Sequence, residues 1–409
     1  MRPASDGKQT TEAAPLSALD ADAVENVYVF VSDALRYDFL PARVAERGLT
    51  CKTTAHALVT PQSLPTMFSG QLPPRHGVKW FDHAVDDDLT TLFDAEWADT
   101  GYSELVWHGD ALRKTLGDPS VTDVTTATPP FVVCEHDNGG HAPYAGHEDE
   151  RPSETLGRVT SRDDLVTLYR RTVAESVDRF LHRVEILRDR GLLDETLVVF
   201  TADHGELLGE YGGFAGHGLP MTPELVYVPT VFSHPSLPTD ETSDSLVQHV
   251  DLYPTIVEVL TGTTPTCDGI PLRTERGGDR SSFVQGSIHP PQRFRDTFLD
   301  PGYDSVGLWT DDGGHVFVEN PRAVRTVTAL YEATSSAYTA ALNSHRNRAL
   351  VIATTLNHYL RDHHEYGSPA LETEAAREWL DALDTSDRES VDRELSEETE
   401  RHLKQLGYR

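Results

Sequence analysis

The sequence predicts an α/β protein: an α/β/α sandwich around a mostly parallel central sheet. Apolar runs of strand length alternate with segments of helical spacing or loop composition over roughly the first 260 residues. Two of these runs end directly before acidic residues, Asp33 and Asp203. Strands that alternate with helices usually form parallel sheets covered on both faces, and such sheets carry their sites at the carboxyl ends of the strands.

The individual elements follow from local patterns. A helix is expected from Ala34 to about Gly48, and one long amphipathic helix between His147 and Asp189, where apolar residues recur every three to four positions. Continuous apolar or β-branched runs predict the strands 27–31, 104–107, 131–134, 196–201 and 226–233.

Composition shifts divide the chain into four parts. We expect a flexible N-terminal tail at 1–24 and a catalytic domain at 25–265. A glycine- and proline-rich stretch with strand-like pieces, Thr326–Ala333 among them, indicates a small C-terminal α+β subdomain at 266–345. The Glu-, Arg- and Leu-rich remainder predicts an acidic helical tail at 346–409.

Charge and composition exclude several classes of protein. Of 409 residues 38% are hydrophobic, which suffices for a buried core, and the net charge is −31. Such a chain repels nucleic acids and anionic membrane surfaces, so no nucleic-acid partner is expected. With only five lysines, the pattern resembles that of cytoplasmic proteins from salt-loving archaea. No segment has the length and apolarity of a membrane span or signal peptide, so we expect a cytoplasmic protein.

The three cysteines (Cys51, Cys134 and Cys267) lack the spacing of a structural metal site or a disulfide framework. Buried free thiols are expected.

Four segments carry residues suited to chemistry: VFVSDALRYDF with Asp33, TPQSLPTMFSG with Thr60, HAPY with His141, and TADHGE with Asp203 and His204. Alone, Asp33 could cap a helix, Thr60 could begin a turn, and His141 could be a loop residue. Asp203-His204 favours a functional site by itself, because a buried strand rarely ends on two titratable groups without partners.

Taken in order, these segments resemble the alkaline phosphatase superfamily, in particular its sulfatase-like branch, over most of Asn26 to Leu272. The shared patterns are D-x-x-R-x-D from Asp33, T-P-x-S-x-P-x-M-x-x-G from Thr60, P-x-x-H-G-V from Pro73, HAPY, TLVVFTADHGELLGE and HVDLYPTIVEVL.

The resemblance implies a set of roles. Thr60, at a helix start that offers backbone N–H groups to an oxyanion, would be the nucleophile. Asp33, Asp203, His204 and Thr60 would bind one divalent cation, and His141 and His217 would hold the transferred group and protonate the leaving oxygen. Mixed oxygen and nitrogen ligands favour Mn²⁺ or Zn²⁺, with Ca²⁺ or Mg²⁺ less suited. His217 could instead only order its glycine-rich turn.

Two departures bear on the substrate. The formylglycine segment C/S-x-P-x-R is absent, and threonine cannot be converted to that aldehyde. Ser32 stands where calcium-type sulfatases carry a further aspartate. Thr60 therefore favours phosphodiester or phosphonate-ester chemistry within the branch. An Asp-x-x-x-His spacing at Asp178 and His182 lies within the long predicted helix, where a helical ion pair is expected and not a second metal site.

Three further residues are expected to have structural roles: Arg36 pairing with Asp38, and His249 with Asp251 supporting the fold.

The sequence thus predicts a metal-dependent hydrolase of sulfate or phosphate esters that acts through a covalent Thr60 intermediate. Its substrate would be a small anionic ester, and one form of this prediction is an ester linked to a sugar or a lipid. Two alternatives stay open: a transferase that passes a phosphoryl or phosphoglycerol group to an alcohol, and an inactive sulfatase-like binding protein. The oligomeric state is left open.

Overall fold

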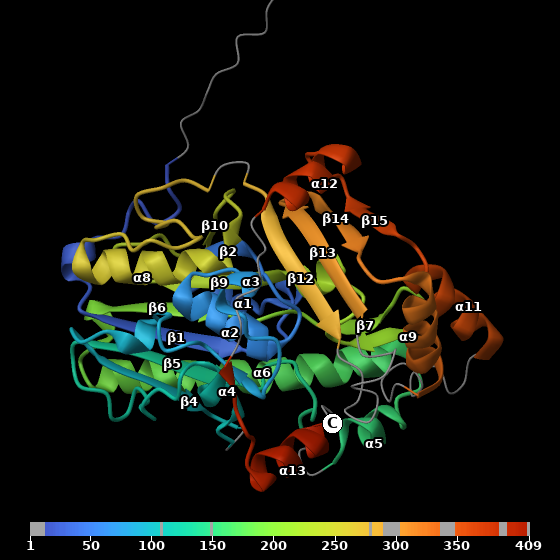
Figure 1. Cartoon of the computed structure of the whole chain (residues 1–409). Helices are drawn as coiled ribbons and strands as arrows, with labels where there is room; N and C mark the ends of the chain where they lie inside the picture. Colours follow the sequence, from blue (N-terminus) through green and yellow to red (C-terminus); the bar gives the residue numbers. More distant parts are fainter. Residues whose placement is uncertain are drawn as a thin grey trace, which may run out of the picture.

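The computed structural model describes residues 13–106, 109–147, 150–277, 280–288, 303–335, 348–383 and 391–406. Its centre is a mixed, mostly parallel sheet in the order β10-β2-β9-β6-β1-β5-β4, with β11 pairing β2 (Figure 1). The central strand β1 runs parallel to β5 and β6, while β9 runs antiparallel to β6 and β2. The strand bounds are β1 Asn26–Ser32, β2 Leu49–Thr54, β4 Asp99–Glu104, β5 Phe131–Asp137, β6 Thr196–Thr201, β9 Tyr227–Ser233, β10 Glu241–Thr242 and β11 Val247–Gln248.

Helices cover both faces of this sheet, which confirms the predicted sandwich. On one face α2, α4 and α8 enclose an apolar core that includes Val27, Val29 and Phe68. On the other face the 28-residue helix α6 packs against Tyr28 and Phe30, which point the opposite way from Val27 and Val29 as the strand alternates. The helices of this region are α1 Ala42–Ala45, α2 Thr60–Ser69, α3 Pro73–His76, α4 Ala111–Thr115, α5 Pro152–Leu156, α6 Arg162–Asp189, α7 Pro223–Val226 and α8 Leu252–Thr261.

Most predicted elements of the main sheet and its helices are found; two differ from the prediction, and one strand was not predicted. The expected helix from Ala34 is replaced by a turn, the 3-10 helix Tyr37–Phe39 and the short α1, because Ala34 adopts a left-handed backbone with φ of 57°. The strand expected at 104–107 lies earlier, at Asp99–Glu104, and is a partly exposed edge strand with little apolar signal. Strand β2 was not predicted, since its sequence LTCKTT is rich in polar residues.

A second, antiparallel sheet with the order β12-β13-β14-β15 lies beside the first (Figure 1). The segment Thr326–Ala333, expected to be strand-like, is helical and belongs to α9, where tertiary packing overrides its β-branched residues. The second sheet takes strands from both sides of the boundary expected at residue 345. Its elements are β12 Ser282–Ile288, β13 Tyr303–Thr310, β14 Gly313–Val318 and β15 His363–Gly367, with α9 Arg322–Ser335 and α11 Arg348–Tyr359 alongside.

The C-terminal segment is not wholly helical as expected. It contributes β15 to the second sheet, and β16 pairs with β3 of the N-terminal half. Hydrogen bonding between Thr399 and Asp110 fixes the last helix against α4. The remaining elements are β3 His83–Ala84, β7 Leu207–Glu210, β8 Phe214–Gly216, α12 Thr373–Ala382, β16 Val391–Asp392 and α13 Glu397–Leu406.

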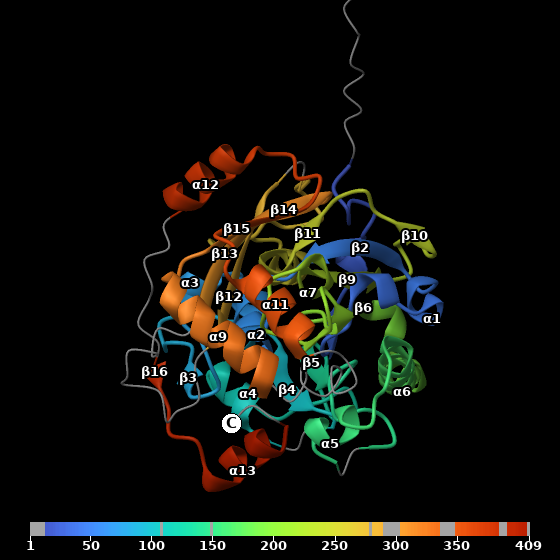
Figure 2. The same ribbon diagram turned by 90° about the vertical axis from the view of Figure 1, so that its right-hand side faces the viewer.

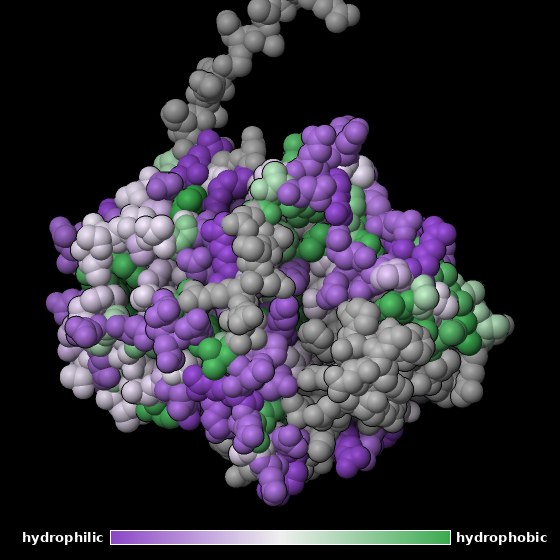
Figure 3. Space-filling view, viewed as in Figure 1, coloured by the Kyte–Doolittle hydropathy of each residue, from purple (hydrophilic) through white to green (hydrophobic). Residues whose placement is uncertain are grey.

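The described surface in Figure 3 is mainly hydrophilic, as the acidic composition requires. No helix in the described ranges is long and apolar enough to cross a membrane. Cys51 and Cys134 are buried, Cys267 is partly exposed, and all three are free thiols. Residues 1–12 of the tail expected at 1–24 lie outside the described residues. Residues 13–24 are not a flexible tail, because Leu16 and Leu19 are buried in the core and the N–H of Leu16 donates to the carbonyl oxygen of Leu272.

Candidate active site

Asp33 stands directly after the central strand β1 and is fully buried. Its backbone N–H donates to the carbonyl oxygen of Asp137 on the neighbouring strand, at 2.9 Å, which fixes the turn. Neither carboxylate oxygen has a hydrogen-bond partner among the described residues. Burial, followed by the charge of Asp203, raises the pKa of Asp33 well above its usual range. A buried carboxylate left in this state is costly unless a cation accompanies it.

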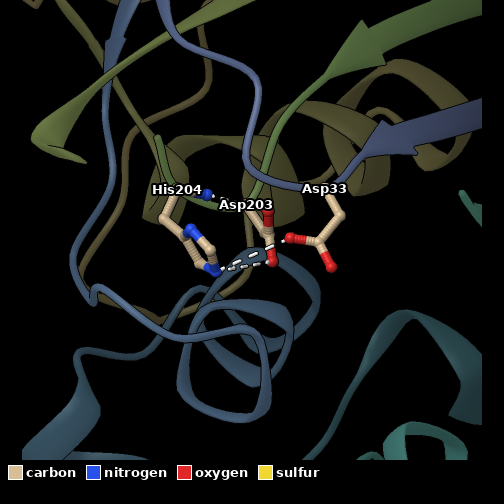
Figure 4. A group of neighbouring side chains, drawn as sticks. All are labelled: Asp33, Asp203 and His204. Carbon is tan, nitrogen blue, oxygen red and sulfur yellow. Dashed lines mark hydrogen bonds and ion pairs between the residues drawn. The ribbon is translucent and has the colours of Figure 1, made fainter. Parts of the chain in front are cut away.

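Asp203 and His204 follow the adjacent parallel strand β6 and lie beside Asp33 (Figure 4). One oxygen of Asp203, Oδ1, accepts hydrogen bonds from the backbone N–H groups of Ala34 and His204, at 3.0 and 2.9 Å. Its other oxygen lies 3.4 Å from Nε2 of His204, and the same nitrogen lies 3.7 Å from Oδ1 of Asp33. Burial raises the pKa of Asp203, but His204, His136 and the Thr60 hydroxyl lower it to about 2.

The donor set fits a divalent cation. Asp33, Asp203 and His204 each offer one ligand atom, and these atoms lie within 4.8 Å of one another. The separations of 3.4 and 3.7 Å between Nε2 of His204 and the two carboxylates suit donors to one ion with bonds of about 2.0 to 2.3 Å. Nδ1 of His204 lies 2.9 Å from the carbonyl oxygen of Gly205 and donates to it, which leaves the Nε2 lone pair directed at the carboxylates. This second contact is typical of histidines that bind metals.

Thr60 begins helix α2 and is fully buried at the edge of the cluster. Its Oγ1 lies 3.4 Å from Nε2 of His204. The structure therefore brings together all four residues predicted to bind the metal. The N–H groups of Gln62 and Ser63 donate to the carbonyl oxygen of Val59, and Pro61 has no N–H. The expectation that this helix start offers N–H groups to an oxyanion therefore stays a prediction, which rests on the N–H of Thr60.

The two predicted catalytic histidines lie next to this cluster. The ring of His217 stacks on His204 with centroids 4.5 Å apart, and His141 lies 4.8 Å from His217. Burial, and then the neighbouring imidazoles, lower the pKa values of both residues well below the usual value. Both pKa values thus lie below the reference value of about 6.5 for histidine. Each ring is neutral near pH 7 and carries one N–H donor.

Two residues of the site carried no predicted role. Nε2 of His136, on β5, lies 3.7 Å from Oδ2 of Asp33, because the register of β1 and β5 places His136 beside Val31. Strand order is not readable from a single sequence, so nothing indicated this contact. Glu206 is buried, with Oε2 3.3 Å from Nδ1 of His217, and burial raises its pKa to about 8. Its place three residues after Asp203 was a usable signal.

The residues expected to have structural roles make contacts that support the fold. Arg36 pairs with Asp38 at 2.7 Å and also with Glu210 at 2.8 Å. Nε2 of His249 lies 2.9 Å from the carbonyl oxygen of Ala202, which supports the strand that carries Asp203. Asp251 accepts from Gln248, Ile270 and Arg280.

Asp178 does not form the expected helical pair with His182. It pairs with Arg43 at 2.7 Å, on the exposed side of α6, and takes no part in the candidate site.

Comparison with known proteins places this geometry in a family. The family model described as "Sulfatase" matches residues 80–263, which include His141, Asp203, His204 and His217. The chain is 34% identical over 410 residues to a protein of Haloferax volcanii named low-salt glycan biosynthesis sulfotransferase Agl7, covering 96% of this chain and 99% of the relative.

A second relative is the multifunctional alkaline phosphatase superfamily protein PehA of Trinickia caryophylli. It is 32% identical over 148 residues, which are 35% of this chain and 28% of the relative. Among solved structures, the phosphonate monoester hydrolase of Silicibacter pomeroyi has the same fold, with a TM-score of 0.56 at 13% identity over 85% of this chain and 100% of the other. The full-length relative, the family model and the shared fold together show that this chain belongs to the sulfatase family of the alkaline phosphatase superfamily.

Proposed function

We propose that the chain is a metal-dependent enzyme that cleaves sulfate or phosphate esters by way of a covalent intermediate on Thr60. The observation that carries this proposal is the position of the Thr60 hydroxyl, 3.4 Å from Nε2 of His204 and beside the Asp203 carboxylate. A threonine hydroxyl is a weak nucleophile unless a base or a metal activates it. Here a buried hydroxyl at the start of a helix lies beside the ligand cluster.

Asp33, Asp203, His204 and Thr60 would hold one divalent cation. The ion, when bound, would draw charge from the ester oxygens and favour the ionised form of Thr60. Three oxygen donors and one imidazole suit Mn²⁺ or Zn²⁺ better than Ca²⁺ or Mg²⁺.

Each residue of the site then has one role in the reaction. Oγ1 of Thr60 attacks the sulfur or phosphorus atom, a new bond forms to Oγ1, and the bond to the ester oxygen breaks. His141 and His217 line the same space and are suited to contact the oxygens of the transferred group. One of them, neutral at rest, takes up the proton that Thr60 gives up and passes it to the leaving oxygen. In a second attack, by water or an alcohol, the attacking oxygen displaces Oγ1 of Thr60, and the proton lost by the attacking hydroxyl returns to Thr60.

The acceptor in that second attack separates two functions. Attack by water makes the enzyme a hydrolase. Attack by a sugar hydroxyl makes it a sulfotransferase-like enzyme, and the name of the full-length relative favours this second version and a sulfate-bearing sugar. Because both versions share the Thr60 intermediate, the site geometry is the same for each.

The function is tested with purified protein in high KCl, supplied in turn with Mn²⁺, Zn²⁺, Ca²⁺ and Mg²⁺. A sulfate ester, a phosphate monoester, a phosphate diester and a phosphonate ester serve as donors. Each is assayed with and without an added sugar acceptor, and the products are identified by mass spectrometry. Free sulfate or phosphate indicates hydrolysis, and a modified sugar indicates transfer. Turnover of none of these donors, together with no stabilisation by any of the four cations, would favour the inactive binding protein.

A further inference from the structure

A cavity of about 250 Å³ lies on the α6 side of the main sheet, away from the candidate active site. Val198 on β6 lines it, five residues before Asp203 in the sequence. At a rise of about 3.3 Å per residue this places the two sites roughly 16 Å apart along the strand. Its lining is made up of Val44, Arg47, Phe180, Val184, Leu193, Asp194, Val198, Phe200, Val231, Ser233, His234, Pro235 and Thr239.

Two helices of unequal length border the cavity. Helix α1 has only four residues, whereas α6 has 28, and each contributes one side of the cavity. In Figure 2, α1 and α6 lie on the same side of the molecule, next to β6 and β9. Phe180 and Val184 of α6 and Val44 of α1 form apolar walls, and all three are buried. The exposed residues Asp194, Pro235 and Thr239 mark the mouth.

Among the polar residues that line the cavity, two have a buried side-chain nitrogen without a hydrogen bond of normal geometry among the described residues. These atoms are Nε of Arg47 and Nε2 of His234. The side chain of His234 belongs to a residue that is only 6% exposed. A buried donor without an acceptor is costly, so each nitrogen has a place for one.

The charges of the two groups can be assigned. The backbone N–H of Ser236 donates to Nδ1 of His234 at 3.3 Å, so the proton of the neutral ring is on Nε2. Burial lowers the pKa of His234, which keeps the ring neutral at pH 7. Arg47 is always charged, and no ion pair joins it to an acidic residue within the described ranges, although the chain holds 66 acidic residues. The cavity lining therefore carries one positive charge, one neutral donor and, at the mouth, the carboxylate of Asp194.

We propose that this cavity binds a small amphipathic monoanion, a medium-chain aliphatic carboxylate, with its head at Arg47 and its chain along the apolar walls. The planar guanidinium matches a carboxylate, and the valine and phenylalanine walls match an alkyl chain. The carboxylate of Asp194 at the mouth opposes a doubly charged head such as a phosphate monoester.

The test is isothermal titration calorimetry of the full chain in high KCl with octanoate, compared with 1-octanol, acetate and octyl phosphate. We expect one octanoate per chain. Octanol lacks the charge and acetate lacks the chain, so each should bind about tenfold more weakly or worse, a loss of roughly 1.4 kcal/mol. Octyl phosphate, as a dianion, should also bind less tightly than octanoate.

Variants locate the ligand. Arg47→Gln should weaken octanoate binding about tenfold or more. Val184→Phe places a larger side chain in the cavity and should abolish binding. The matched control is Arg43→Gln, because Arg43 is an exposed arginine of α1 that pairs with Asp178 and does not line the cavity. Its affinity should equal that of the wild type, as should that of Thr60→Ala.

Several results would overturn the proposal. No heat of binding up to about 10 mM octanoate would mean that the cavity is a hydrated packing defect only. Unchanged affinity in Val184→Phe, or loss of affinity in Thr60→Ala, would place the ligand elsewhere. If Arg47→Gln does not fold, the comparison of octanoate with octanol in the wild type still decides whether a charged head is required.

Discussion

Glu206 and His217 are in direct contact, with Oε2 of the carboxyl group 3.3 Å from Nδ1 of the imidazole. The ring of His217 also stacks on the ring of His204, with 4.5 Å between the ring centroids. His217 is therefore held from two sides, by a buried carboxyl group and by a proposed metal ligand. This arrangement explains how a histidine in a glycine-rich loop can keep one orientation.

Replacing Glu206 with glutamine should impair catalysis without greatly changing substrate affinity. The amide keeps the shape of the side chain but weakens its hold on Nδ1 of His217. Loss of a contact that orients an active-site ligand costs about 10- to 100-fold. We expect kcat to fall within that range while KM changes little, as measured by steady-state kinetics. A rise in KM at constant kcat would show that Glu206 acts on substrate binding instead.

Thr60→Ala should keep the fold and lose about 1,000-fold or more of the activity, because the nucleophile is removed. Thr60→Ser restores a hydroxyl at the same position and should recover part of it. Circular dichroism in high KCl checks the fold. Mass spectrometry of the wild type, denatured during turnover, checks for a group bound to Thr60. Near-normal turnover by the alanine variant would rule out a Thr60 intermediate.

Much of this site was predictable because each residue follows a strong local signal. Asp33 and Asp203 end apolar runs, and parallel neighbours place such ends together, as the pairing of β1 with β6 shows. His136 was not predictable, since its contact with Asp33 depends on β5 being the other neighbour of β1. The N–H groups expected at the start of α2 are reduced in number because Val59 accepts from Gln62 and Ser63, a local detail that the sequence does not show.

The fold shows the same division between local and non-local causes. The apolar periodicity of α6 is a property of its own sequence, and the predicted helix is present. Strand β2 has mainly polar residues and is a strand because β9 pairs with it along six residue pairs. Likewise Thr326–Ala333 reads as a strand alone but is helical where α9 packs against α11.

Metal binding should stabilise the wild type but not Asp33→Asn. The variant removes one of two buried carboxylates, Asp33 and Asp203, which repel each other when both are ionised. The metal-free variant should therefore be at least as stable as the metal-free wild type. At 100 times the dissociation constant, a cation adds about 2.7 kcal/mol to the wild type. Thermal unfolding in high KCl with and without Mn²⁺ or Zn²⁺ measures both effects. An equal response of the two proteins would exclude Asp33 as a ligand.

The net charge of −31 should make stability depend on salt. Screening of self-repulsion falls as ionic strength falls, with a Debye length of about 3 Å at 1 M and about 10 Å at 0.1 M. We expect the unfolding temperature to fall steadily as KCl is lowered from molar to 0.1 M. Sucrose at matched osmolarity is the control, because it does not screen charge. Full recovery by sucrose would indicate that solute exclusion, and not charge repulsion, governs stability.

Arg179→Ala should destabilise the protein far more than Arg43→Ala, although each substitution removes the arginine of one ion pair that involves a residue of α6. Arg179 of α6 pairs with Asp137 through Nε and Nη2, at 2.5 and 3.0 Å, and the Asp137 side chain is fully buried at the end of β5. Removing Arg179 leaves that charge without a cation. Such losses cost about 3 to 5 kcal/mol in dry interiors, and since Arg179 is 34% exposed we expect about 2 to 3 kcal/mol. Arg43 and Asp178 are 59% and 63% exposed, so their pair should contribute less than about 1 kcal/mol. Denaturant unfolding of both variants in high KCl measures the difference.

Because the carbonyl oxygen of Asp137 also accepts the N–H of Asp33, Arg179→Ala should weaken metal binding as well, whereas Arg43→Ala should not. Equal losses of stability in the two variants would show that burial of Asp137 does not set the strength of its pair.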